Sequence, residues 1–163
     1  MTQYKITAPS YFNHTVQLPS SKSVSNRALI IHALSGGKVQ PHHLSDCDDT
    51  QVIMNAIMHM PPVIDIKAAG TAMRFLTAFL SISEGEHVLT GTERMQHRPI
   101  GPLVDALRYL GADIEYMGED GYPPLRIHGK QLAGGDIEMP GNVSSQYVSA
   151  LLMLGPVLPK GLN

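Results

Sequence analysis

The chain has 163 residues, of which 43% are hydrophobic and 16% charged, a composition typical of a globular domain and not of a disordered chain. Its net charge of -2 excludes a general electrostatic attraction to nucleic acid or to anionic membranes. A single cysteine, Cys47, excludes an internal disulfide and indicates a reducing compartment. The polar N-terminus lacks a signal core, and no apolar run approaches the roughly 18 residues that a membrane span needs. We therefore expect a soluble, cytoplasmic protein.

In chain order, the clearest pattern is a local design that occurs three times. A short loop of small polar residues is followed by a cationic or amide side chain and then by an almost wholly apolar helix. The copies comprise residues 20–34, 69–80 and 141–153, with Arg27, Arg74 and Gln146 before the apolar stretch. A helix that is apolar all round belongs inside a fold, so we expect all three helices to be buried.

Amphipathic helices and short strands are predicted between these segments. Helical spacing of apolar residues predicts one helix near 48–60, N-capped by Asp48, Asp49 or Thr50. It predicts another near 100–110, with Pro102 close to its start and Gly111 just past its end. Strand-like runs occur at Lys38–Gln40, Val63–Lys67, His87–Thr90, Asp113–Met117, Leu125–His128 and Asp136–Met139. The sequence thus predicts an α/β (or α+β) fold with helices packed inside sheets.

The three loops that precede the apolar helices, called here the helix-start loops (residues 20–27, 69–74 and 141–146), have the composition of anion sites. Free backbone N–H groups at a helix start attract oxyanions, and small residues allow a close approach. For any single loop, ordinary N-capping is the better explanation. Three equivalent loops favour a shared pocket for one or two phosphates, provided that the helices run parallel and their N-termini converge.

The cations near these loops are the candidate ligands of such a pocket. Arginine suits bidentate binding of phosphate or carboxylate, which favours a site role for Arg27 and Arg98 and leaves Arg94 evenly balanced between the site and a solvated surface. Lysine transfers protons more readily than arginine, so Lys22 is the catalytic candidate. The eight histidines contain no metal-binding spacing, so no metal site is expected.

Five ordered segments resemble the EPSP synthase family: residues 18–29, 69–74, 97–107, 122–126 and 143–146. The resemblance covers nearly the whole chain from Leu18. It implies two domains, each an inside-out α/β barrel of three βαβαββ units whose inner helices are parallel, with the active site between the domains. Residues 1–163 would be part of the N-terminal domain, and residues 1–19 a lead-in strand region that belongs with the second domain. The implied reaction transfers the enolpyruvyl group of phosphoenolpyruvate to the 5-hydroxyl of shikimate 3-phosphate, in aromatic amino acid biosynthesis, without a cofactor.

The resemblance also implies roles for individual residues. Those expected to bind shikimate 3-phosphate are Lys22, Ser23, Arg27, Ser144, Ser145 and Gln146. Those expected to bind phosphoenolpyruvate, or to lie close to it, are Lys22, Gly70, Thr71, Arg74, Arg98 and Gln146. Gly70 matches the glycine where the herbicide glyphosate also fits.

The chain departs from the family pattern in two places and ends early. Ala68 stands where the family has Asn, and the stretch from Met60 to Ala68 is short, so we expect altered affinity but unaltered chemistry. No strand follows the third apolar helix before Asn163, so we expect a truncated third unit. The family's catalytic carboxylates come from the second domain, so we expect that domain as a partner and an isolated chain that is inactive and binds ligand weakly.

Two other functions remain open at this point. One is the related enolpyruvyl transferase that acts on UDP-N-acetylglucosamine, whose first loop differs from Ser21-Lys22-Ser23-Val24-Ser25-Asn26-Arg27. The other is a non-catalytic anion-binding module. The chain's length favours such a module, whereas the intact set of Lys22, Arg27, Arg98 and Gln146 favours an enzyme.

Overall fold

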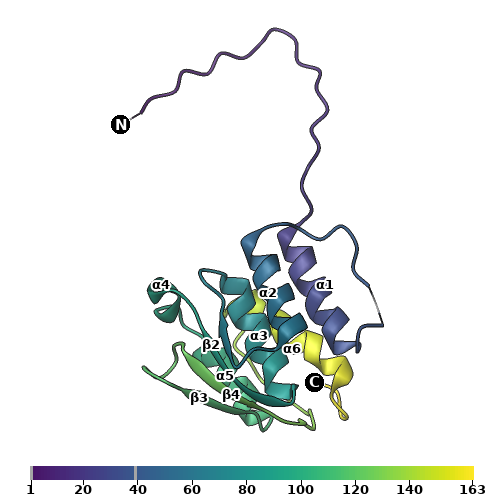
Figure 1. Ribbon diagram of the computed structural model, residues 1–163, viewed down its shortest axis with the longest axis vertical. Coiled ribbons are helices and arrows are strands. Elements are labelled where there is room, and N and C mark those ends of the chain that lie inside the picture. Colours follow the sequence, from purple (N-terminus) through teal and green to yellow (C-terminus); the bar gives the residue numbers. More distant parts are fainter. Residues whose placement is uncertain (1, 39) are drawn as a thin grey trace.

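The computed structural model describes residues 2–38 and 40–163 (Figure 1). Residues 2–19 are exposed, contain no helix or strand, and extend away from the remainder of the chain (Figure 1). The helices α1 (Lys22–Leu34) and α2 (Asp48–His59) follow them and pack against each other. The assignment of residues 1–19 to a second domain stays a prediction.

A mixed four-stranded sheet forms the other side of the molecule (Figure 1). It consists of β1 (Val63–Asp65), β2 (Gly85–Thr90), β3 (Asp113–Tyr116) and β4 (Leu125–Gly129), in the order β1-β2-β4-β3. β1 and β2 are parallel, whereas β4 runs antiparallel to both β2 and β3. The prediction of an α/β fold is therefore confirmed, and four of the predicted strands form within a few residues of their expected bounds.

Two predicted strands have a different outcome. Residues 136–139 form no strand, so that prediction is wrong; an isolated parallel bridge between Gly135 and Leu162 lies just before them. A strand needs a partner along its length to satisfy its backbone groups, and the chain supplies one here only at that bridge and at the bond from Ile137 N–H to the Asn163 carbonyl. The predicted strand Lys38–Gln40 includes Val39, which lies outside the described residues; Lys38 and Gln40 are not in a strand.

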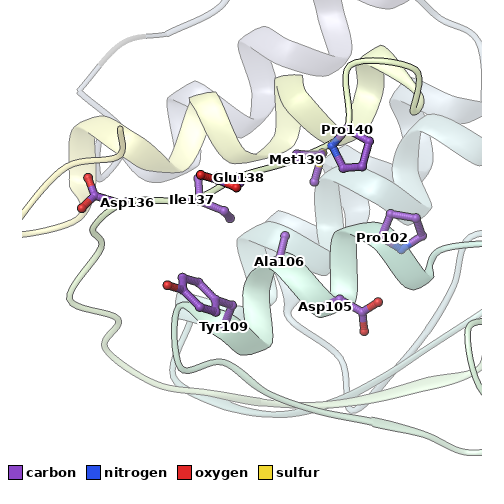
Figure 2. A pocket seen from close by; sticks show the side chains of 9 residues that line it. All are labelled: Pro102, Asp105, Ala106, Tyr109, Asp136, Ile137, Glu138, Met139 and Pro140. Carbon is purple, nitrogen blue, oxygen red and sulfur yellow. The ribbon is translucent and has the colours of Figure 1, made fainter.

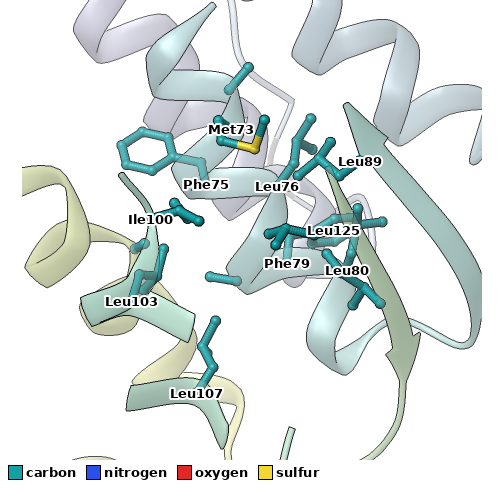
Figure 3. Packing of buried hydrophobic residues seen from close by; sticks show 14 of the residues in the cluster. Met73, Phe75, Leu76, Phe79, Leu80, Leu89, Ile100, Leu103, Leu107 and Leu125 are labelled. Atoms are coloured by element: carbon teal, nitrogen blue, oxygen red, sulfur yellow. The ribbon is translucent and has the colours of Figure 1, made fainter. Parts of the chain in front are cut away.

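The helix α3 (Gly70–Ile82) is the centre of the hydrophobic core. All its residues except Thr71 and Ile82 are buried. Figure 3 shows its apolar side chains packed against β2 and β4 on one side and α5 (Gly101–Tyr109) on the other. From β1 to β4 the elements therefore follow the order strand, helix, strand, helix, strand, strand, with the short unpredicted helix α4 (Glu93–Gln96) between β2 and α5.

The expectation of complete burial is confirmed for α3 alone. In the apolar stretch of α1, Ile31 is 48% exposed, and in α6 (Ser145–Leu154), Leu152 is 66% exposed. Each of these helices packs against α3 on one side and leaves apolar side chains uncovered on another. The prediction is therefore wrong for α1 and α6, because no helix or strand of residues 2–38 and 40–163 covers those side chains. After α6, the 3-10 turn η1 (Gly155–Val157) leads to the end of the chain.

Helix starts follow capping rules with informative exceptions. Ser21 caps α1, its hydroxyl accepting a bond from Val24 N–H at 3.4 Å, and Ser144 caps α6 in the same way. Cys47, and not one of the three predicted residues, is the N-cap of α2. Ala69 precedes α3 and offers no side-chain cap. The first N–H groups of α3 are therefore without the side-chain acceptor that α1 and α6 have.

No helix within the described residues has both the length and the apolarity needed to cross a membrane.

Candidate anion-binding site

The starts of α1, α3 and α6 lie against one another. The Gln146 Nε2 atom, in the first turn of α6, donates to the Thr71 hydroxyl in the first turn of α3 at 3.3 Å. One turn further along, Arg27 of α1 donates to the Ser149 hydroxyl of α6 at 3.2 Å, and its guanidinium lies 5.2 Å from the centre of the Phe75 ring of α3. Contacts at two successive levels in the same order mean that α3 and α6 run in the same direction, with their N-termini side by side.

Two guanidinium groups lie at the N-terminus of α3. Arg74 donates from Nη1 to the Gly70 carbonyl at 2.7 Å, and its side chain is buried. The guanidinium of Arg98 lies against the same part of Gly70, where a β-carbon would overlap it. Within the described residues, no carboxylate forms an ion pair with either arginine. This end of α3 therefore carries positive charge that the chain itself does not neutralise.

The surroundings of Arg74 disfavour its positive charge. Burial lowers the pKa of Arg74 below its usual range, and the positive charge of Arg98 lowers it further. The buried Nε of Arg74 has no hydrogen-bond partner, and burying a polar group without a partner costs free energy. A bound anion would relieve both effects, since it supplies the missing negative charge and acceptor atoms.

Tyr147 holds this arrangement together. Its hydroxyl donates to the Pro99 carbonyl at 2.6 Å, which ties α6 to the segment that carries Arg98. Its ring lies under Arg74, with the guanidinium 5.8 Å from the ring centre. The sequence analysis missed this residue, although an aromatic side chain with a polar end, placed directly after Gln146, was a visible signal.

The remaining predicted residues line the starts of α1 and α6. Lys22 begins α1 and is half-exposed, with its Nζ 3.6 Å from Oδ1 of Asp49 in the first turn of α2. Ser23 is exposed, and its carbonyl accepts a bond from Arg27. Ser144 and Ser145 are exposed at the start of α6. Asp49, expected only as a helix cap, is instead the residue that contacts the candidate proton carrier.

Arg94 is separate from these groups. It is exposed on α4 and makes no hydrogen bond or ion pair with any described residue. Its surroundings favour the solvated surface role over a role in the site.

A separate cavity lies away from these residues. Figure 2 shows it between α5 and residues 136–140, with a volume of about 580 Å³. It contains the carboxylates of Asp105, Asp136 and Glu138 and none of the predicted ligands, so it is unsuited to an anion. A second cavity of about 280 Å³ lies between the start of α2 and residues 66–69, and Asp49 lines it. No group of histidine, cysteine, aspartate and glutamate in the described part of the chain could hold a metal ion.

Comparison with known proteins identifies the family. The family model described as EPSP synthase (3-phosphoshikimate 1-carboxyvinyltransferase) matches residues 6–62 and 58–163. A 3-phosphoshikimate 1-carboxyvinyltransferase of Bacteroides fragilis is 64% identical over 161 residues, which cover 99% of this chain and 39% of that protein. The protein of the same name from Shewanella amazonensis is 43% identical, over 99% of this chain and 44% of its own length.

A solved structure agrees with the sequence comparisons. EPSP synthase from Acinetobacter baumannii superposes with a TM-score of 0.73 at 26% identity, over 86% of this chain and 37% of that one. The chain thus spans about two fifths of the length of the curated relatives that it matches. On the family match and the relatives together, this chain belongs to the EPSP synthase (3-phosphoshikimate 1-carboxyvinyltransferase) family.

Proposed function

We propose that this chain supplies the shikimate 3-phosphate side, and part of the phosphoenolpyruvate side, of an active site for enolpyruvyl transfer. The observation that carries the proposal is the pair of guanidinium groups, Arg74 and Arg98, at the uncapped start of α3, neither of which has a carboxylate partner among the described residues. Family membership supports it, since the relatives from Bacteroides fragilis and Shewanella amazonensis are named 3-phosphoshikimate 1-carboxyvinyltransferase, after this transfer.

The residues divide between the two substrates. We assign shikimate 3-phosphate to Lys22, Ser23 and Arg27 on α1 and to Ser144, Ser145 and Gln146 on α6. The serines of this set are exposed. We assign phosphoenolpyruvate to Gly70, Thr71, Arg74 and Arg98, with Lys22 and Gln146 shared between the substrates. The Gln146–Thr71 hydrogen bond joins the two groups and supports a single continuous site.

The chemistry requires both cations and proton transfer. The 5-hydroxyl of the sugar gives its proton to a base and attacks C2 of phosphoenolpyruvate, while an acid adds a proton to C3. The tetrahedral intermediate then loses phosphate from C2 and a proton from C3. Cations stabilise the phosphate and carboxylate charges in this sequence, and Lys22 is the group of this chain that could exchange a proton with the reacting atoms.

The fold supports a further, finer proposal. The order from β1 to β4 is one complete βαβαββ unit, and α1 with α2, and α6, are parts of two further units of an inside-out barrel. A second domain would supply carboxylates and the remaining phosphoenolpyruvate ligands, and residues 1–19 would pack with it. On this proposal the protein acts in the cytoplasm, and the isolated chain binds substrate weakly and does not turn it over.

A chimaeric enzyme tests the proposed function. This chain replaces the matched 39% of the Bacteroides fragilis relative, and phosphate release is measured with phosphoenolpyruvate and shikimate 3-phosphate. We expect a steady rate that Lys22→Met and Arg98→Met each reduce by at least tenfold, one charged hydrogen bond being worth about that much. UDP-N-acetylglucosamine serves as the alternative acceptor. An inactive but folded chimaera, or transfer to the UDP-sugar alone, would contradict the proposal.

A further inference from the structure

We propose that Asp49 is a positioning residue that holds Lys22 in the substrate pocket. The inference rests on the proposed function, because it gives Lys22 a ligand to meet. It goes beyond that function in assigning a role to a residue of α2, a helix that contributes none of the predicted ligands.

The ion pair itself is asymmetric. Asp49 Oδ1 lies 3.6 Å from Lys22 Nζ, and the carboxylate side chain is 19% exposed whereas the lysine side chain is 50% exposed. The carboxylate is therefore the fixed partner, and the lysine is the partner that would otherwise move.

Two buried hydrogen bonds join α2 and the loop before it to the first two turns of α1. Thr50 donates from its hydroxyl to the Asn26 side-chain oxygen at 2.7 Å, and Ser45 N–H donates to the Ser25 hydroxyl at 2.8 Å. All four residues are buried, and buried hydrogen bonds of this kind are costly to break. Because Asp49 directly precedes Thr50, its backbone is set relative to Lys22 by these contacts.

No other cation competes for this carboxylate. Lys67 lines the same 280 Å³ cavity as Asp49, but its ammonium lies 2.6 Å from Asp65. The hydrogen bonds and charge of Lys67 lower the pKa of Asp65 accordingly. Asp48, the neighbouring carboxylate in the same turn of α2, forms no ion pair with a described residue. Within the described chain, Asp49 alone neutralises a cation of the proposed site.

Physical chemistry explains why Lys22 needs such a partner. Lys22 is the first residue of α1, and the positive end of the helix dipole there disfavours a nearby cation. Its side chain is flexible and carries three equivalent donors. A carboxylate paired with the ammonium offsets the dipole and restricts the side chain, and the donors of the ammonium remain for a substrate oxyanion.

The first test measures the ion pair without any ligand. The acylation rate of each lysine by an amine-reactive ester is followed by peptide mass spectrometry in the wild-type chain, in Asp49→Asn and in the matched control Asp48→Asn. We expect Asp49→Asn to change labelling at Lys22 alone, with a rise of about two- to fivefold, the range for a partly exposed ion pair. Unchanged labelling at Lys22, or an equal rise in Asp48→Asn, overturns the inference.

The second test measures the consequence for binding. Affinity for shikimate 3-phosphate is titrated by NMR in a double-mutant cycle that combines Asp49→Asn with Lys22→Met. We expect Asp49→Asn to weaken binding about two- to fivefold when Lys22 is present and to have no effect in the Lys22→Met chain. Asp49→Glu should restore part of the loss, and circular dichroism should show all variants folded.

The outcomes separate the inference from the proposed function. If the wild-type chain binds no shikimate 3-phosphate, the proposed function is contradicted, and the inference that rests on it fails with it, although the labelling test still reports the ion pair. If the wild-type chain binds and Asp49→Asn binds equally or more tightly, positioning by Asp49 is wrong and the proposed function stands. A loss that persists in the Lys22→Met background also overturns the inference, because Asp49 would then act through the fold.

Discussion

The guanidinium of Arg98 lies against the backbone of Gly70, in the space that a β-carbon at residue 70 would occupy. Arg74 approaches the same space, since its Nη1 would lie 2.7 Å from that β-carbon. Only a residue without a side chain allows both cations to lie this close to the uncapped N-terminus of α3. A side chain at residue 70 would therefore move positive charge away from the proposed phosphoenolpyruvate site.

Replacing Gly70 tests this relationship. In Gly70→Ala the backbone needs no strained conformation, because the residue has no positive φ, so we expect little change in thermal stability. The added methyl group displaces Arg98, and affinity for phosphoenolpyruvate should fall about tenfold, equivalent to one charged hydrogen bond. Affinity for shikimate 3-phosphate should fall less. Both are measured by NMR titration.

Gly101→Ala provides the control. Gly101 also begins a helix, and a β-carbon there would meet its nearest neighbour, the Gly121 Cα, at 3.4 Å. We expect it to leave both affinities unchanged. Equal affinities for phosphoenolpyruvate in Gly70→Ala and the wild-type chain would mean that Arg98 does not bind it.

Arg74 should strengthen anion binding and lower the stability of the ligand-free protein. Its charge is buried beside Arg98 with an unpartnered Nε, and replacing such a charge with an apolar side chain is often neutral or stabilising. We expect Arg74→Met to keep or raise the free energy of unfolding, by about 1 kcal/mol, as measured in urea. Phosphate should raise the melting temperature of the wild-type chain above its value in chloride, and this increase should be lost in Arg74→Met.

Arg108→Met is the matched control for Arg74. Arg108 also donates to a carbonyl, that of Ile114, and also lies over a tyrosine ring, that of Tyr116 at 4.8 Å. It is on α5, away from the helix-start loops, so its removal should lower stability and leave the phosphate effect intact. A phosphate effect that survives in Arg74→Met would contradict an anion site at Arg74.

The local sequence pattern predicts the helices and strands of this chain better than it predicts which of their sides are buried. The apolar run of α3 is buried because a sheet and four other helices, α1, α2, α5 and α6, surround it. Similar runs in α1 and α6 leave Ile31 and Leu152 exposed, because burial depends on a neighbouring element and not on the run itself. The alternation in residues 136–139 likewise predicts a strand, but within the described residues its backbone partner is limited to the Gly135–Leu162 bridge and the bond from Ile137 N–H to the Asn163 carbonyl.

The same limit applies to the site. Repetition of the helix-start loops predicted that Gln146 and Thr71 belong to one pocket, and they are hydrogen-bonded to each other. The contact between Tyr147 and Pro99 and that between Lys22 and Asp49 join segments that are distant in the sequence. No spacing rule predicts such contacts, since they depend on how α6 and α2 pack.

The buried pair Asn26–Thr50 should be important for stability. In Asn26→Ala the Thr50 hydroxyl loses its acceptor in a buried position, which costs about 1–3 kcal/mol. Thr50→Val should cost a similar amount, and the double variant should cost less than the sum of the two. Urea unfolding measures the stability of the wild-type chain, the two single variants and the double variant.

Ser35→Ala is the control. It removes a local bond to the His32 carbonyl at the other end of α1 and should change stability by less than about 0.5 kcal/mol. Additive losses in the double variant would show that the two side chains do not act as a pair.

Tyr147→Phe tests whether the position of Arg98 matters for binding, because it leaves the charge of Arg98 unchanged. The variant keeps the ring under Arg74 and removes the hydroxyl that donates to the Pro99 carbonyl at 2.6 Å, so stability should fall by about 1 kcal/mol. Because the segment that carries Arg98 is then no longer tied to α6, affinity for phosphoenolpyruvate should fall about threefold or more, while binding of shikimate 3-phosphate at the α1 and α6 starts is retained. Tyr109→Phe, at an exposed position of α5, should change neither quantity. If Tyr147→Phe loses stability but binds phosphoenolpyruvate as tightly as the wild-type chain, the Tyr147 hydroxyl supports the fold without setting the position of Arg98.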